Sequence, residues 1–187
     1  MGWSYDVAHL ADWIGCAAPV EPAGRVTGVS TDTRTLQPGD IYVALRGPNF
    51  DAENFVAEAF SKRAAAAITR APHKAGPCLV VPEPLTALQR FASRHRMSLD
   101  IPVFGLTGSC GKTTAKEFCG ALLSTRYTVV KTQGNLNNDI GCPLSLLRMD
   151  RHTEFAVIEM GANHVGEIEA LCGIARPTET AVTMVAP

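Results

Sequence analysis

A lysine and a threonine inside a loop of small residues are the first side chains in this sequence with an evident chemical use. Residues 103–117 read VFGLTGSCGKTTAKE. Small residues allow successive backbone N–H groups to surround a phosphate, and the N-terminus of a following helix adds its dipole. Lys112 can then reach the β- and γ-phosphates of a nucleotide, and the Thr113 hydroxyl is a natural ligand for Mg²⁺. The stretch predicts a phosphate-binding loop.

The loop departs from the strict P-loop pattern at one position. The pattern GxxxxGK[ST] requires a glycine where Leu106 stands. The alternative interpretation is a plain glycine turn that carries a solvated lysine. The setting between a predicted strand and a predicted helix favours phosphate binding.

The elements around this loop alternate strictly. Strands are predicted at 103–107, 127–132, 154–160 and 180–186, and helices at 113–126, 143–148 and 166–175. Such alternation predicts right-handed βαβ units and a parallel sheet. Since a doubly wound domain normally continues into further helices and strands, we expect residues 101–187 to be the N-terminal part of a P-loop ATPase domain.

The first half of the chain has a different pattern. Trp3, Val7, Leu10 and Ile14 predict an amphipathic helix that ends at Gly15. The other predicted elements are two β-rich segments within 25–45, a helix at 51–64 with Asp51 as its N-cap and Phe55, Ala59 and Phe60 on one face, strands at 64–69 and 78–81, and a helix at 84–97. We therefore predict an α/β protein with a small mixed α/β domain at 1–100 and a boundary near residue 100.

Two further residues could take part in catalysis. Glu159 ends the apolar strand EFAVIE, and the carboxyl ends of neighbouring parallel strands open on the same crevice as a phosphate loop. A carboxylate there can bind a metal ion, although a solvent-facing strand end is the alternative. His164, in GANHVGE, could contact substrate or metal, or be structural.

A second unusual stretch is rich in amides. Residues 134–144 read GNLNNDIGCPL and follow the predicted strand after the P-loop helix. Asparagine and aspartate favour turns because their side chains bond to nearby backbone, so an ordinary loop is one interpretation. The other is a binding loop, because the segment leaves the carboxyl end of a strand, where ligands bind. Amide groups there could hydrogen-bond a sugar or a peptide.

Composition and charge argue against several classes of function. The formal net charge is −1 without a long basic run, so nucleic-acid binding through a broad basic patch is not favoured. No stretch approaches the ~18 apolar residues of a membrane span, and the N-terminus lacks the features of a signal peptide. The six cysteines never form a CxxC pair, which predicts isolated, buried thiols in a reducing compartment. We expect a cytoplasmic globular protein.

Three segments together carry a family resemblance. TGSCGKTT, GNLNNDIGCPLSLLR and AVIEMGANHVGEIE, in this order and spacing, resemble the Mur ligases of peptidoglycan synthesis. The TGxxGKT loop alone would indicate only the wider ligase family that includes folylpolyglutamate synthetase, and the shorter loop of that family accounts for Leu106. The segment STDTRTLQPGDIYVALRGPNFDAENFVAEAF is similar to the uridine-nucleotide-binding domain of the Mur ligases.

The resemblance implies roles for particular residues. The UDP end of the substrate would be bound by Ser30, Thr31, Asp32, Arg34, Asn49 and Phe50. ATP would be bound by Thr107, Gly108, Ser109, Cys110, Gly111, Lys112, Thr113 and Thr114. Mg²⁺ would lie between Thr113 and Glu159, and the catalytic residues would be Lys112, Glu159 and His164. The muramoyl peptide would pass Asn135, Asn137, Asn138 and Asp139. Cys110 stands where the family commonly has asparagine or serine, so only its backbone N–H is expected to bind.

The implied reaction is ATP-dependent amide-bond formation. A ligase of this kind joins D-alanyl-D-alanine to UDP-N-acetylmuramoyl-tripeptide through an acyl phosphate. The resemblance also implies a metal-binding histidine, a carbamylated lysine and a C-terminal domain beyond residue 187, so we expect these 187 residues to be inactive by themselves. Three alternatives stay open: a non-catalytic protein that binds UDP-sugar peptides, a P-loop nucleotide switch with a protein partner, and another Mur ligase or a ligase of the folylpolyglutamate synthetase type.

Overall fold

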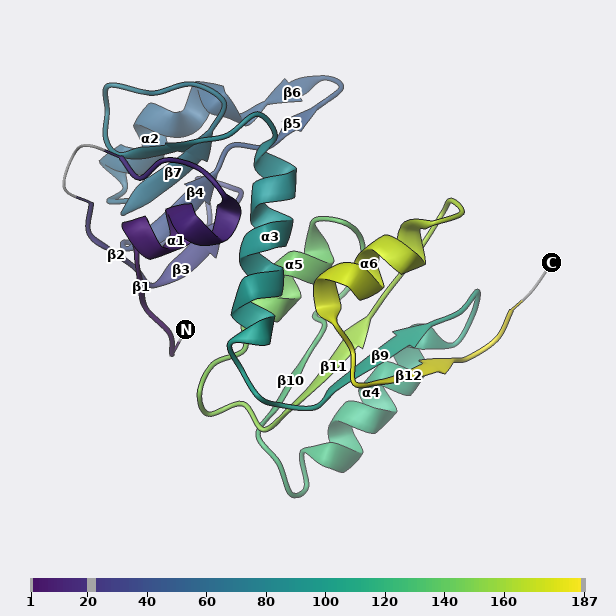
Figure 1. Cartoon of the computed structure of the whole chain (residues 1–187). Helices are drawn as coiled ribbons and strands as arrows, with labels where there is room; N and C mark the ends of the chain where they lie inside the picture. The colour runs from purple at the N-terminus through teal and green to yellow at the C-terminus, as the bar shows by residue number, and fades with distance from the viewer. Residues whose placement is uncertain (1, 20–22, 186–187) are drawn as a thin grey trace. The chain divides into compact units, whose positions relative to one another are not determined.

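The computed structural model describes residues 2–19 and 23–185 (Figure 1). The chain divides into two compact units, Trp3–Phe91 and a second that contains Gly2 and the chain from Ala92 onward. The division falls inside helix α3 (Pro84–Met97), whereas the sequence places the boundary near residue 100. The binding roles assigned to the two domains stay predictions.

The first unit is built on a parallel four-stranded sheet. Its strands, in spatial order, are β3 (Gly28–Ser30), β4 (Asp40–Val43), β7 (Ala66–Thr69) and β8 (Cys78–Val80). Two short antiparallel pairs accompany it: β1 (Tyr5–Asp6) with β2 (Arg25–Val26), and β5 (Arg46–Gly47) with β6 (Phe50–Asp51). Every residue of β4 and β7 is buried, as expected for parallel strands that are covered on both faces. The predicted α/β class is confirmed.

The helices of this unit differ in detail from the prediction. Helix α1 (Val7–Ile14) begins after Trp3, and Gly15 ends it with a φ of 78°. Asp51 does cap the next turn, since its carboxylate accepts a hydrogen bond from the Glu53 N–H. That turn is the 3₁₀ helix η1 (Ala52–Phe55), followed by α2 (Val56–Ser61).

The predicted helical face that includes Phe55 is wrong. Ala59 is buried, but Phe55 is 38% exposed and stacks on Phe50. The tighter 3₁₀ turn has three residues per turn instead of 3.6, so Phe55 is rotated off the face that α2 buries.

The second unit also contains a parallel four-stranded sheet. Its strands, in spatial order, are β10 (Val129–Lys131), β11 (Phe155–Glu159), β9 (Val103–Thr107) and β12 (Glu179–Val182). Its helices are α4 (Lys112–Leu123), α5 (Gly141–Leu146) and α6 (Glu167–Ala175). Helix α4 covers one face of the sheet, and α5 and α6 cover the other (Figure 1). Glu159 pairs in register with Leu106, so the carboxyl ends of β11 and β9 lie side by side.

The sequence predicts no membrane-spanning segment and six buried, unpaired cysteines. None of the helices in the described ranges is long and apolar enough to cross a membrane.

The six cysteines all lie in described parts of the chain and form no disulfide. The expectation that they are buried is correct for Cys142 but wrong for Cys110, which is exposed in the phosphate loop. Burial raises the pKa of the Cys142 thiol to about 12.

The part of α3 that belongs to the second unit contains a buried histidine, which is bonded within that unit. The His95 Nε2–H donates to the Met149 carbonyl at 2.9 Å, and the side chain has no exposed surface. Burial lowers the pKa of His95 below its ordinary value of 6.5, because the charged imidazolium would lose its hydration.

This burial predicts a pH-dependent stability. An unfolded chain binds the proton of His95 more readily than the folded chain, so the free energy of unfolding should decrease as the pH falls below about 6.5. Denaturant titrations between neutral and mildly acidic pH would measure this slope. In His95→Gln, which keeps a donor for the Met149 carbonyl, the slope should be shallower. An unchanged slope would assign the pH dependence to other groups.

Candidate functional site

The predicted phosphate loop connects β9 to the N-terminus of α4. Gly108 and Gly111 have positive φ angles of 138° and 84°, a backbone region that side chains with a Cβ rarely adopt. A Cβ on Gly108 would lie 2.3 Å from the Thr183 Oγ1 and 2.9 Å from the Met184 carbonyl oxygen. Glycine is therefore required at this position by conformation and by space.

The polar groups of the loop are bonded to the chain itself. The Lys112 Nζ donates to the Gly108 carbonyl at 2.5 Å. The Ser109 N–H donates to the Met184 carbonyl, and the Thr183 hydroxyl donates to the Cys110 carbonyl, both at 2.6 Å. A bound phosphate would have to replace the bonds of Lys112 and Ser109, whereas Thr183 holds the shape of the loop.

Glu159 lies next to the loop. The Thr113 hydroxyl donates to its Oε2 at 3.1 Å, and the Asn137 Nδ2 donates to its Oε1 at 2.8 Å. Glu159 is 1% exposed, so it is not a solvent-facing strand end. One carboxylate thus connects the phosphate loop to the asparagine-rich segment, which are the two unusual stretches of the sequence.

Lys116 is the member of this cluster that the sequence did not indicate. Its side chain is buried, with the Nζ 3.5 Å from the Glu159 Oε2 and 3.3 Å from the Gly134 carbonyl that it donates to. The available signal was its spacing from Thr113, because residues three apart in a helix share a face. A lysine at that spacing is normally solvated, so the signal is weak.

The side chains of the asparagine-rich segment make two kinds of contact, one with Glu159 and the other with the backbone of the segment itself. The Asn137 side chain points to Glu159, whereas the Asn138 Oδ1 accepts from the Gly141 N–H at the start of α5, at 2.8 Å. Asn135 and Asp139 are exposed. The prediction that all four line the path of a substrate stays a prediction, and only Asn137 is bonded to the carboxylate.

The donor set at Thr113 and Glu159 fits Mg²⁺. This ion is usually held by one or two carboxylates together with substrate phosphates and water, and it prefers oxygen ligands. Within the described residues, no group of three or more His, Cys, Asp or Glu side chains could hold a metal ion. The Thr113 hydroxyl and the Glu159 carboxylate, 3.1 Å apart, are too few ligands for a metal site made of protein groups alone, so an Mg²⁺ ion there would need further oxygen ligands such as phosphate and water.

His164 is not brought to this cluster by any described contact. Its side chain is exposed in the segment between β11 and α6. Its backbone N–H donates to the Glu167 Oε2 at 3.2 Å, and no hydrogen bond described for this chain joins its ring to Thr113 or Glu159. A catalytic role for His164 stays a prediction.

A pocket of about 570 Å³ lies in the first unit, at the predicted uridine-nucleotide site. Its lining residues are Thr31, Asp32, Thr33, Arg34, Tyr42, Phe50, Phe55 and Glu58. The rings of Phe50 and Phe55 stack with centroids 5.8 Å apart. The pocket therefore combines an aromatic wall, on which a planar ring could stack, with charged and hydroxyl groups.

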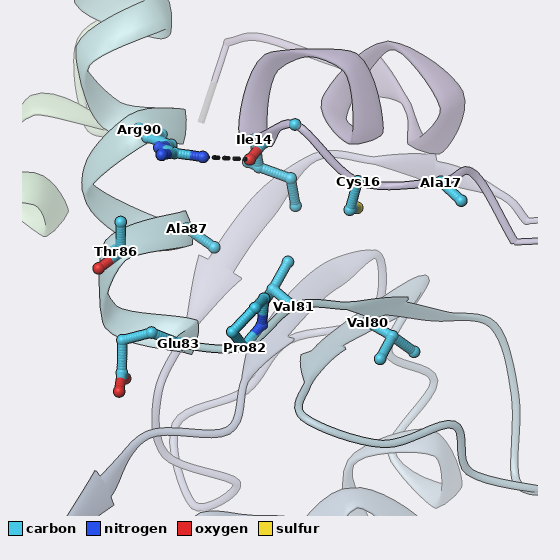
Figure 2. A pocket seen from close by; sticks show the side chains of 11 residues that line it. Ile14, Cys16, Ala17, Val80, Val81, Pro82, Glu83, Thr86, Ala87 and Arg90 are labelled. Carbon is cyan, nitrogen blue, oxygen red and sulfur yellow. Dashed lines mark hydrogen bonds between the residues drawn. The ribbon is translucent and has the colours of Figure 1, made fainter.

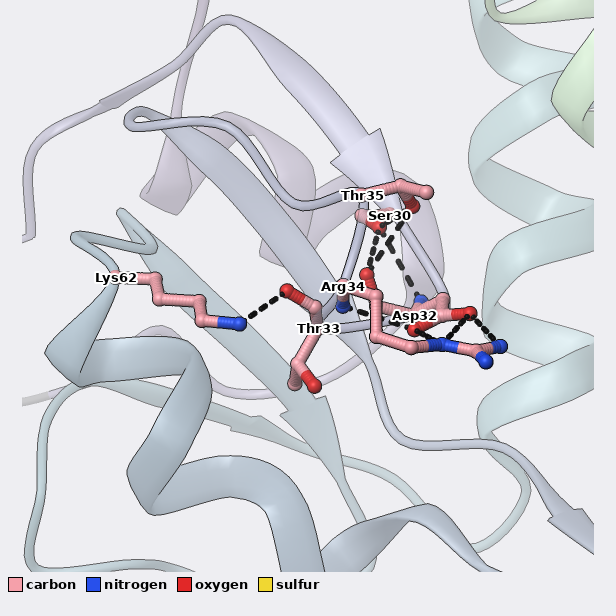
Figure 3. Close-up of polar contacts among 6 residues, drawn as sticks. All are labelled: Ser30, Asp32, Thr33, Arg34, Thr35 and Lys62. Carbon is pink, nitrogen blue, oxygen red and sulfur yellow. Dashed lines mark hydrogen bonds and ion pairs between the residues drawn. The ribbon is translucent and has the colours of Figure 1, made fainter.

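The polar side of this pocket is held by an ion pair (Figure 3). The Arg34 Nε and Nη2 donate to both oxygens of Asp32, at 2.5–3.0 Å. Arg34 lowers the pKa of Asp32 to about 2. Ser30 supports the turn by donating to the Asp32 carbonyl at 2.8 Å, but it does not line the pocket. Asn49 is exposed in the turn between β5 and β6 and is not in the lining either.

Sequence reasoning missed part of this lining. The missed residues are Thr33, Tyr42, Phe55 and Glu58. Tyr42 and Glu58 lie in elements whose patterns carry no signal of a ligand. Phe55 had a usable signal, its short spacing from Phe50 across a turn, and Thr33 lies between two predicted residues.

A smaller hollow of about 360 Å³ lies between the end of α1 and the start of α3 (Figure 2). Its walls combine apolar side chains with Glu83, Thr86 and Arg90, and the Arg90 Nη1 donates to the Ile14 carbonyl at 3.2 Å. The guanidinium is thereby engaged at the C-terminal end of α1. The pocket of about 570 Å³ offers a ligand a wider range of charged and hydroxyl groups than this hollow does.

Comparisons with known proteins match both units. The family model of the Mur ligase middle domain matches residues 106–187. The UDP-N-acetylmuramoyl-tripeptide--D-alanyl-D-alanine ligase of Bacillus subtilis (strain 168) is 41% identical over 162 residues, which cover 84% of this chain and 35% of the relative. The ligase with the same name from Escherichia coli (strain K12) is 42% identical over 159 residues, with the same two shares.

Solved structures agree with these matches. Crystal structure I of MurF from Acinetobacter baumannii has a TM-score of 0.91 at 34% identity and covers 96% of this chain and 41% of that chain. The MurF ligase from Thermotoga maritima in complex with ADP has a TM-score of 0.74 at 35% identity, covering 81% of this chain and 36% of that chain. The chain spans about a third of the length of the curated relatives.

Proposed function

Since this chain belongs to the Mur ligase family, we propose that it supplies two parts of a peptidoglycan ligase: the unit that binds UDP-N-acetylmuramoyl-tripeptide and the phosphate loop that binds ATP. The complete ligase would add D-alanyl-D-alanine to the tripeptide, the activity named for the relatives. This reaction would take place in the cytoplasm, where ATP is available.

The observation that supports this proposal most strongly is the double engagement of Glu159. Thr113 from the phosphate loop and Asn137 from the asparagine-rich segment donate to the same carboxylate. A reaction in which a phosphoryl group passes from a nucleotide to a second substrate needs both binding segments at one place.

The proposed chemistry has two steps. A carboxylate oxygen of the tripeptide attacks the γ-phosphorus of ATP, so that an acyl phosphate forms and ADP leaves. The amine of D-alanyl-D-alanine then attacks the acyl carbon, loses a proton and displaces inorganic phosphate. The negative charge that collects on the transferring oxygens would be stabilised by Lys112, by the loop N–H groups and by the α4 dipole.

Mg²⁺ fits the same site. It would be held by Thr113 and Glu159 and would neutralise phosphate charge when bound. ATP use is supported by the Thermotoga maritima relative, which was crystallised with ADP.

The UDP group should carry much of the substrate recognition by the first unit. We expect the chain to bind UDP-N-acetylmuramoyl-tripeptide more tightly than a muramoyl tripeptide without UDP. Arg34→Ala should weaken binding of the UDP compound by about tenfold, because hydrogen bonds to charged groups contribute about 1.5–3 kcal/mol. Titration calorimetry with both ligands measures these differences.

A matched control is available on the same unit. Arg25 is also an exposed arginine paired with an aspartate, Asp6, but it does not line the pocket. Arg25→Ala should leave the affinity for the UDP compound unchanged. Equal affinities for the two ligands in the unmodified chain would rule out the uridine site and would favour the nucleotide-switch alternative.

A further inference from the structure

Lys116 forms a buried ion pair with Glu159 beside the phosphate loop and has no role in the reaction described above. Lys116 on α4 and Glu159 at the end of β11 are 0% and 1% exposed, and the Nζ lies 3.5 Å from the Oε2. Burying a charge without a partner is strongly unfavourable, so each of these two groups depends on the other.

The other contacts of the Lys116 ammonium are weaker compensation. It donates to the Gly134 carbonyl at 3.3 Å, which is a neutral group. Its second carboxylate, Glu117 at 3.3 Å, is about half exposed and also pairs with Lys131. Glu159 is therefore the buried carboxylate that balances the charge of Lys116.

The position of the ammonium coincides with the site expected for a divalent cation. Both would approach the Glu159 carboxylate on the side where the Thr113 hydroxyl lies, since Thr113 and Lys116 both contact the Oε2. Two cations beside one carboxylate repel each other strongly away from bulk water. Nucleotide phosphates would bring the negative charge that allows both to remain.

We propose that Lys116 is a positioning residue that acts as the built-in counter-ion of Glu159 and keeps free divalent cations out until they arrive with nucleotide phosphate. The inference rests on the proposed function for the location of the cation site. When neither metal nor nucleotide is bound, the negative charge of Glu159 is balanced by the ammonium of Lys116. The coupling of metal entry to nucleotide entry follows from the charge of Lys116, not from its shape.

The test measures Mn²⁺ binding to the 187-residue chain without nucleotide. The electron paramagnetic resonance signal of free Mn²⁺ reports its affinity. Lys116→Met and Lys116→Gln should both bind Mn²⁺ at least about tenfold more tightly than the unmodified chain, because a repelling charge is removed. Lys116→Arg keeps the charge and should bind Mn²⁺ as the unmodified chain does. Unchanged affinity in both neutral variants would overturn the proposal.

Two further measurements separate this role from simple packing. In Lys116→Met/Glu159→Gln the gain in Mn²⁺ affinity should disappear, and a gain that persists would contradict the proposed location. Lys116→Met should unfold at a lower temperature than the unmodified chain, and Mn²⁺ should raise this temperature more in the variant. Destabilisation without recovery by Mn²⁺ would indicate a packing role alone and overturn the proposal. Failure of the proposed function would instead be seen in the UDP-ligand titration, which concerns the other unit.

Discussion

Replacing Lys112 by alanine should lower the turnover of a complete ligase that contains this chain by about 10²–10³-fold, the usual effect of removing one preorganised electrostatic contact to a developing charge. The Lys112 ammonium lies within the loop, 2.5 Å from the Gly108 carbonyl, so it already occupies the space where phosphate is expected. Negative charge increases on the transferring oxygens, so the loss should appear in turnover. Steady-state kinetics with saturating substrates measure this effect.

A second lysine of the same unit provides the control. Lys131 pairs with Glu117 at the surface, and exposed ion pairs typically contribute about 0–1 kcal/mol. Lys131→Ala should therefore leave turnover close to that of the unmodified enzyme. UDP-ligand affinity should be unchanged in Lys112→Ala, because that ligand is assigned to the other unit. A Lys112→Ala enzyme within about threefold of normal turnover would mean that this lysine does not act on the transferring group.

The closeness of Thr113 and Glu159 could be predicted because each residue lies at a recognisable position, one in the phosphate-loop pattern and the other at the end of an apolar strand. The loop pattern and its strand–loop–helix setting depend only on neighbouring residues. Glu159 follows from a general rule, that the carboxyl ends of parallel strands share one edge of the sheet. The register of β11 with β9 then places the two residues together.

The burial of Lys116 could not be predicted in the same way. A lysine on a helix is usually solvated, and its burial here depends on the Gly134 carbonyl and on Glu159, which are distant in sequence. The same holds for the direction of Asn137, since a turn-forming interpretation and a site interpretation fit the same composition. Phe55 was misassigned because a 3₁₀ turn replaced the expected helical turn.

The attachment of the chain after β12 to the phosphate loop is a further long-range feature. The Met184 carbonyl accepts a hydrogen bond from the Ser109 N–H. A phosphate bound in the predicted loop would need that same N–H as a donor. Neither residue carries a sequence signal for this contact. Local patterns therefore predicted the segments of the candidate site, whereas the hydrogen bonds among these segments depend on the tertiary arrangement.

We expect the 187-residue chain by itself to release no phosphate in response to UDP-N-acetylmuramoyl-tripeptide and D-alanyl-D-alanine together. The chain spans about a third of the length of its curated relatives. Phosphoryl transfer depends on simultaneous placement of metal, phosphate and nucleophile, and an error of about 1 Å can cost about 10²-fold in rate. Here Ser109 and Lys112 are bonded to Met184 and Gly108, so nucleotide binding should be weak at most.

A phosphate-release assay tests this expectation, with each substrate omitted in turn and with Lys112→Ala as the control. Background hydrolysis would be insensitive to the two substrates and to the substitution, and it would leave the expectation intact. Release that needs both substrates and disappears in Lys112→Ala would contradict it. That result would mean that residues within this chain position the acceptor amine. The strand β12 would be the first candidate for those residues, because it is mostly exposed and pairs with β9, the strand that leads into the phosphate loop.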